Sequence, residues 1–152
     1  MVKVCRIPEP KAMLEFENWG GTTMAYVDIV TALAVLQFLI FGMKTGRART
    51  RYGVAAPAVT GNPMFERSFR VQQNTLEMLI VFLPALYLFS HYFSPFWAAG
   101  LGVVYLVGRE IYAYGYVKDP PKRGAGFGIS AIPVLILLLG GLGGAVWRLL
   151  RP

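Results

Sequence analysis

The chain has 152 residues, of which 55% are hydrophobic and only 15% are charged, and its net charge is +7. A soluble domain of this size carries about 25% charged residues, so the composition predicts a membrane protein with several spans. The single cysteine, Cys5, excludes an intrachain disulfide, and with His91 as the single histidine we expect no metal site. The basic residues concentrate in two predicted loops, which favours a role in membrane orientation over nucleic-acid binding, and we expect no nucleic-acid partner.

Residues 1–23 are polar and mixed in charge, and we expect them to form an extension before a membrane domain at residues 24–152. They do not resemble a signal peptide, because no apolar core follows Lys3 and Arg6. Trp19 and its apolar neighbours fit a short interfacial helix, and they fit a loosely ordered extension equally well.

Four apolar segments have about the 20 residues that a helix needs to cross a bilayer. They are residues 25–43, 65–92, 96–117 and 127–150. We therefore predict an all-α membrane protein, a bundle of four transmembrane helices, in which Gln37 faces other helices. Lys and Arg concentrate in the predicted loops 44–64 and 118–126, whereas the turn at residues 91–95 has neither. By the positive-inside rule, both loops should face the cytoplasm.

The second segment opens with a polar stripe. Its members are spaced three, four and three residues apart, which places them on one face of a helix: Arg67, Arg70, Asn74 and Glu77. Polar side chains are costly inside a membrane, and they usually have a function there. Arg67 is expected to share this face and also fits a purely structural role between helices.

A second stripe lies on the third segment, with spacings of four, three and four residues: Tyr105, Arg109, Tyr112 and Tyr116. Glu77 lies nine residues, or about 14 Å, from Ser68, and Arg109 lies nine residues from Lys118, so both are expected at a similar depth in the same half of the membrane. The two stripes are expected to meet, either within the bundle or against another subunit. They fit a buried structural network in which Glu77 pairs with an arginine. They also fit a site for a zwitterionic ligand that has a net negative charge and carries both carboxylates and an amine. Arginine binds carboxylates, and glutamate binds ammonium groups.

Two blocks of sequence closely resemble the membrane-associated proteins in eicosanoid and glutathione metabolism, the MAPEG family. The first, PAVTGNPMFERSFRVQQNTLE, covers residues 57–77, and the second, GVVYLVGR, covers residues 102–109 and is followed by Tyr112 and Tyr116. The resemblance extends over residues 25–148 and is nearest to the microsomal glutathione transferases and cysteinyl-leukotriene synthase. It implies a homotrimer of four-helix bundles, with glutathione sites between subunits in the cytoplasmic half.

The resemblance also implies roles for individual residues. Positions that match glutathione contacts of the family are Arg49, Arg70, Gln72, Asn74, Glu77, Arg109, Tyr112 and Tyr116. Gln73 is added to this set because it is expected to face the second stripe together with Arg70, Asn74 and Glu77. Arg123 matches the arginine that activates the glutathione thiol in conjugating members. Two departures stand out: Met78 replaces a tyrosine that follows the glutamate in some relatives, and Met64 replaces a common acid.

The function implied by the resemblance is a membrane-bound glutathione transferase. It would join glutathione, as co-substrate and without a metal, to lipophilic electrophiles, with reduction of lipid hydroperoxides or leukotriene-synthase-like activity as further possibilities. The expected location is a bacterial inner membrane or the endoplasmic reticulum, among membrane lipids. The alternatives are a non-catalytic lipid-binding scaffold, like the lipoxygenase-activating member of the family, and a small transporter or structural subunit. Arg123 favours the enzyme.

Overall fold

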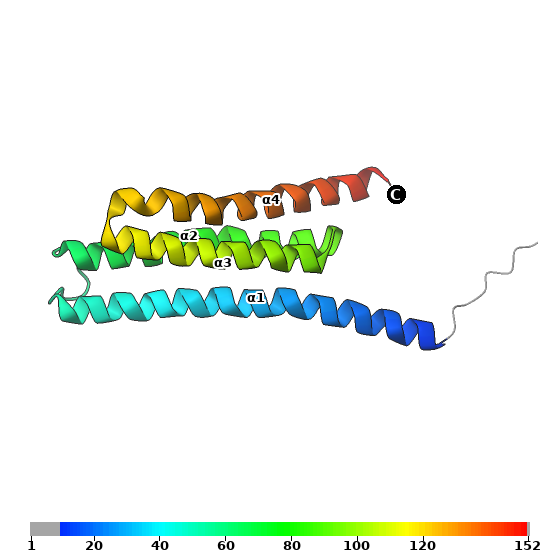
Figure 1. Cartoon of the computed structure of the whole chain (residues 1–152), viewed down its shortest axis with the longest axis horizontal. Helices are drawn as coiled ribbons and strands as arrows, with labels where there is room; N and C mark the ends of the chain where they lie inside the picture. Colours follow the sequence, from blue (N-terminus) through cyan, green and yellow to red (C-terminus); the bar gives the residue numbers. More distant parts are fainter. Residues whose placement is uncertain (1–9, 152) are drawn as a thin grey trace, which may run out of the picture.

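Four long α-helices make up the part of the chain that the computed structural model describes, residues 10–151, with side chains from residue 24 onward. They are α1 (Pro10–Arg51), α2 (Pro63–Tyr92), α3 (Pro95–Lys118) and α4 (Arg123–Leu150), and a 3-10 turn, η1 (Pro120–Lys122), joins α3 to α4. In Figure 1, α2 and α3 lie between α1 and α4, and the α1–α2 loop lies at the same end as η1. We call this end of the bundle the loop end. The predicted all-α architecture with four helices is confirmed.

Three segments of the described chain are long and apolar enough to cross a membrane: Met24–Arg51, Pro63–Tyr92 and Pro120–Leu150. The remaining helix, α3, has 24 residues, which is long enough. Its second half contains Arg109, Glu110 and three tyrosines, which interrupt the apolar run of this helix. A membrane crossing by α3 stays a prediction.

The first helix is longer than predicted. α1 begins at Pro10 and continues to Arg51, so the expectation of a loop from residue 44 is wrong. The thickness of a bilayer limits the apolar part of a helix and not the helix itself, and Lys, Arg and Ala are good helix formers. The first breaker is Gly53, whose φ of 65° is the left-handed conformation that commonly ends a helix. Residues 1–9 and the side chains of residues 10–23 lie outside the described part, and so does the predicted interfacial contact of Trp19.

Prolines mark where the later helices begin. Pro63 is the first residue of α2, and the Asn62 side chain caps this helix by accepting a hydrogen bond from the Met64 backbone N–H at 2.9 Å. α4 begins at Arg123, four residues before the predicted apolar segment. Pro120 and Pro121 lie in η1, directly ahead of α4. Prolines are compatible with the first turn of a helix, so they do not prevent α4 from beginning here. Arg123 therefore lies in the first turn of α4.

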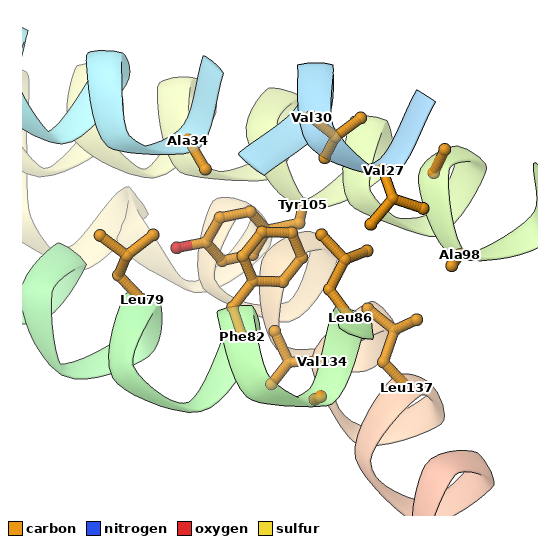
Figure 2. Packing of buried hydrophobic residues seen from close by; sticks show 12 residues of the cluster. Val27, Val30, Ala34, Leu79, Phe82, Leu86, Ala98, Tyr105, Val134 and Leu137 are labelled. Carbon is orange, nitrogen blue, oxygen red and sulfur yellow. The ribbon is translucent and has the colours of Figure 1, made fainter. Parts of the chain in front are cut away.

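The core joins all four helices around one aromatic pair. The rings of Phe82 on α2 and Tyr105 on α3 stack with centroids 3.9 Å apart, and both side chains are fully buried. Figure 2 shows apolar side chains around this pair, among them Val30 from α1 and Leu137 from α4. Burying such side chains contributes about 1.5–3 kcal/mol each, so this cluster fixes the rotation of α2 and α3 relative to each other.

Small residues bring α3 and α4 together near the loop end. A β-carbon added to Gly126 would overlap the backbone of Tyr112, and one added to Gly108 would lie 2.6 Å from the backbone nitrogen of Ser130. Such close backbone approach is typical of membrane helices that pack through small side chains. The position of Tyr112 therefore depends on a glycine in α4.

We expect Gly126→Ala to lower the stability of the folded protein by roughly 1–3 kcal/mol, because the new methyl group would push α4 away from α3. Gly128 is the matched control, since it lies two residues further along α4 and a β-carbon there would meet nothing within 4 Å. Thermal unfolding of both variants in detergent measures the difference. Equal stability of the two variants would show that the close approach at Gly126 is not required.

Candidate functional site

The most deeply buried charge in the described chain belongs to Arg109. Its side chain is 0% exposed, and its Nη2 donates a hydrogen bond of 2.6 Å to Thr75 Oγ1 on α2. The Thr75 hydroxyl in turn donates to the carbonyl oxygen of Val71 at 2.7 Å, which fixes the direction of its lone pairs. The Arg109 Nε and Nη1 atoms have no hydrogen-bond partner among the described residues. This guanidinium is thus held in place through a single neutral acceptor.

A row of rings and cations continues from Arg109 to the loop end. The Arg109 Cζ atom lies 4.1 Å from the centroid of the Tyr112 ring, at cation–π distance. The Tyr112 and Tyr116 rings follow with centroids 5.6 Å apart, and Arg123 Cζ lies 5.4 Å from the Tyr116 ring. We call Arg109, Tyr112, Tyr116 and Arg123 the α3 group. The structure brings these four predicted site residues together.

Arg123 ends this row with an exposed guanidinium in the first turn of α4. The N-terminus of a helix carries a partial positive charge, so the helix and the guanidinium act in the same direction on a nearby anion. The neighbouring Lys122 instead forms an ion pair with Asp119, at 3.4 Å. Arg123 is therefore the cation of this turn that is placed to attract an anionic group.

Three other predicted residues, Arg70, Gln73 and Glu77, form a second group on α2. They line a pocket of about 360 Å³, together with side chains of the α1–α2 loop that include Thr60. We call Arg70, Gln73 and Glu77 the α2 group. Arg70 and Glu77 are exposed, and the Glu77 carboxylate makes no ion pair with any side chain of residues 24–151. The predicted network in which Glu77 pairs with an arginine is therefore not formed within one described chain.

The remaining predicted residues make local contacts. Asn74 Nδ2 donates to the Arg70 carbonyl one turn earlier, at 2.9 Å. Gln72 faces α1, where a β-carbon added to Gly42 would lie 3.3 Å from its Nε2 atom. Arg49 donates to the carbonyl oxygen of Ala58 at 2.7 Å, so it holds the α1–α2 loop. None of these three joins the α3 group in a single chain.

The two groups do not meet within one chain. On α2, Thr75 accepts the bond from Arg109 and Val71 packs in one cluster with Tyr112, whereas no α3 residue lines the pocket of the α2 group. Arg70 is adjacent to Val71, and Glu77 follows Thr75 by two residues. Because helix positions one or two residues apart do not share a face, Arg70 and Glu77 lie on another face of α2. The expected meeting of the stripes inside the bundle is thus not seen, and their meeting against another subunit stays a prediction.

The sequence reasoning missed Thr75, although a polar residue four positions after Val71, on the apolar face of α2, was a usable signal. Two of its interpretations are confirmed. Arg67 has the structural role considered for it, because its Nη1 donates to the carbonyl oxygen of Val117 at 3.1 Å. Gln37 faces other helices, since its Nε2 donates to the carbonyl of Leu106 and the carboxylate of Glu110.

Residues 27–143, which include residues of all four α-helices, match the sequence model of the MAPEG family. The chain belongs to the MAPEG family. Microsomal glutathione S-transferase 2 of Homo sapiens is 44% identical over 115 residues, which are 75% of this chain and 78% of the relative. Leukotriene C4 synthase of Cavia porcellus is 38% identical over 115 residues, covering 76% of this chain and 77% of the relative.

An uncharacterised protein of Synechocystis is also similar, with 46% identity over 128 residues, or 84% of this chain and 93% of that protein. The recognition of the family from residues 57–77 and 102–116 is thus confirmed over most of the chain. For this MAPEG protein, both the α2 group and the α3 group lie inside the matched region.

Proposed function

We propose that this MAPEG protein is a membrane-bound glutathione transferase, which joins the glutathione thiolate to lipophilic electrophiles. Relatives that bear the names glutathione S-transferase and leukotriene C4 synthase support the general activity. The observation that carries the proposal is the α3 group, in which an exposed arginine at a helix N-terminus lies beside tyrosine rings. The positive charge of this arginine and of the helix N-terminus favours a bound thiolate over the neutral thiol.

The chemistry follows from these charges. A free thiol has a pKa near 8.5 and is only a few per cent ionised at neutral pH. In the proposed complex, the Arg123 guanidinium and the first turn of α4 would lower this pKa by attracting the negative sulfur. The thiolate then attacks an electrophilic carbon: the C–S bond forms, the bond to the leaving group breaks with its electron pair, and the thiol proton goes to solvent. With a lipid hydroperoxide, two glutathione molecules would instead be oxidised to the disulfide, giving an alcohol and water.

Glutathione would bridge two subunits in this proposal. The α2 group offers Arg70 for a carboxylate and Glu77 for the amine, whereas the α3 group offers the thiol activator, and one chain does not bring them together. A homotrimer, as the family resemblance implies, would bring the α2 group of one subunit to the α3 group of the next. We place the loop end in the cytoplasm, because the basic residues of the α1 C-terminus and of η1 both lie there.

An assay of the purified protein in detergent tests the proposed function directly. Glutathione and a chromogenic, apolar electrophile should yield a conjugate whose absorbance increases with time and with enzyme concentration. Binding of glutathione without any conjugate, for several electrophile classes and for a lipid hydroperoxide, would contradict the enzyme and favour the non-catalytic scaffold.

We expect Glu77→Gln to weaken glutathione binding about 10-fold or more, because the amide cannot form a charge-assisted bond with the ligand ammonium group. Isothermal titration with glutathione measures this effect. Glu110→Gln is the control: Glu110 is also an exposed glutamate, but its carboxylate accepts a hydrogen bond from Gln37 and lines no part of the α2 group pocket. An affinity of Glu77→Gln equal to that of the unmodified protein would remove Glu77 from the site.

A further inference from the structure

A larger cavity, of about 650 Å³, lies between α1, α2 and α3 at the loop end. We call it the α1–α3 groove. Its apolar wall comes from all three helices and includes Phe41, Val71, Ala113 and Val117. No member of the α2 group or the α3 group lines it. The groove is therefore separate from the proposed glutathione site, and its volume lies in the range of about 300–1,000 Å³ that is typical of ligand pockets.

Three cations line this groove: Lys44 on α1, Arg67 on α2 and Lys118 on α3. Arg67 is anchored by its bond to the Val117 carbonyl, whereas the two lysine side chains are exposed. The Lys44 ammonium lies 5.1 Å from the centroid of the Phe41 ring, and the Lys118 ammonium lies 5.6 Å from the centroid of the Tyr114 ring, so both lysine stems run along the wall of the groove. Within the described chain, neither lysine has an acidic partner within 4 Å.

Glu110 is the single acid among the residues that line the groove, and it lies away from the lysines along the helix. It precedes Lys118 by eight residues of α3, which is about 12 Å along the axis. Its carboxylate already accepts a hydrogen bond of 3.1 Å from Gln37. The groove thus has a cationic rim toward the loop end and an apolar wall below it.

We propose that the α1–α3 groove binds one anionic phospholipid of the surrounding membrane. The phosphate would lie between Lys44 and Lys118, and an acyl chain would follow the wall formed by Phe41 and Val71. Basic pockets between membrane helices are sites for anionic headgroups, and an amphiphile matches both the charge and the apolar surface of this groove. The lipid site does not depend on the proposed transferase activity.

Native mass spectrometry of the detergent-purified protein, with lipid added at known concentration, tests this proposal. Phosphatidylglycerol should bind on the order of 10-fold more tightly than phosphatidylcholine with the same acyl chains. The double variant Lys44→Gln/Lys118→Gln should lose this preference. The control variant Arg47→Gln/Lys122→Gln removes two positive charges from exposed side chains at the same end that do not line the groove, and it should keep the preference.

Several results would overturn the proposal. Equal binding of the two lipids would show that the rim does not select charge, and an equal loss in both double variants would show non-specific attraction to a basic surface. Absence of any retained lipid would indicate that a second copy of the chain covers the groove.

Glycerol 3-phosphate should not displace the lipid, and displacement by it would reduce the site to a phosphate site without the acyl chain. If the double variant fails to fold, the single changes Lys44→Gln and Arg47→Gln give the same contrast.

Discussion

Replacing Arg123 with alanine is expected to lower the conjugation rate at pH 7 by about 25-fold and to leave glutathione affinity within a few-fold of the original. The expected size follows from thiol ionisation. If the arginine lowers the thiol pKa from about 8.5 to about 6.5, a shift worth about 2.7 kcal/mol, its removal lowers the thiolate fraction at pH 7 from about three quarters to about 3%.

The sign of the pH dependence makes this prediction specific. A lowered thiol pKa keeps the thiolate populated at neutral pH, so the unmodified protein should reach its full rate near pH 7.5. The variant should continue to gain rate up to pH 9, where a thiol with an ordinary pKa ionises. Stopped-flow measurement of thiolate absorbance in the glutathione complex, together with rate profiles between pH 6 and 9, tests this shift.

Lys122→Ala is the matched control for Arg123→Ala. It removes the neighbouring positive charge, which is already paired with Asp119, and it should change neither the rate nor the pH profile appreciably. An Arg123→Ala protein with the original pH profile and no glutathione binding would show that Arg123 holds the peptide and does not ionise its thiol.

Replacing Thr75 with valine is expected to destabilise the protein by about 2–3 kcal/mol. Valine has nearly the same shape, so the change removes the acceptor of the 2.6 Å bond from Arg109 and little else. A guanidinium that is 0% exposed then loses its anchored partner, and an unsatisfied buried polar group costs about 1–3 kcal/mol, or more when it is charged. Because Arg109 stacks on Tyr112, glutathione affinity should fall as well.

Thr75→Ser separates the hydroxyl from the methyl group. Serine keeps the acceptor and loses one methyl, which costs roughly 1 kcal/mol at a site that is 1% exposed. Thermal unfolding in detergent should therefore rank the unmodified protein first, serine second and valine last. If valine is as stable as serine, the bond between Thr75 and Arg109 contributes little, and Tyr112 is positioned by α4 alone.

Much of the fold was predictable from local features of the sequence. Apolar runs of about 20 residues and the turn-forming prolines place α2 and α3 within two residues of the predicted bounds. The end of α1 was predicted wrongly because hydropathy reports where the bilayer ends, whereas the helix continues to Arg51, two residues before the left-handed Gly53. The candidate site residues were proposed from two motifs, and which of them lie together in one chain was not predictable from those motifs.

The sequence by itself determined the helical, membrane-compatible chain, the family and the two polar stripes, because periodicity and composition are local properties. Only the tertiary structure decided which neighbour each stripe meets. Helical spacing places Arg70 and Glu77 on one face of α2, but it does not orient that face. The stacked pair of Phe82 and Tyr105 orients α2 against α3, so that Thr75 receives the bond from Arg109, while Arg70 and Glu77 are exposed on another face, away from the tyrosines they were expected to meet.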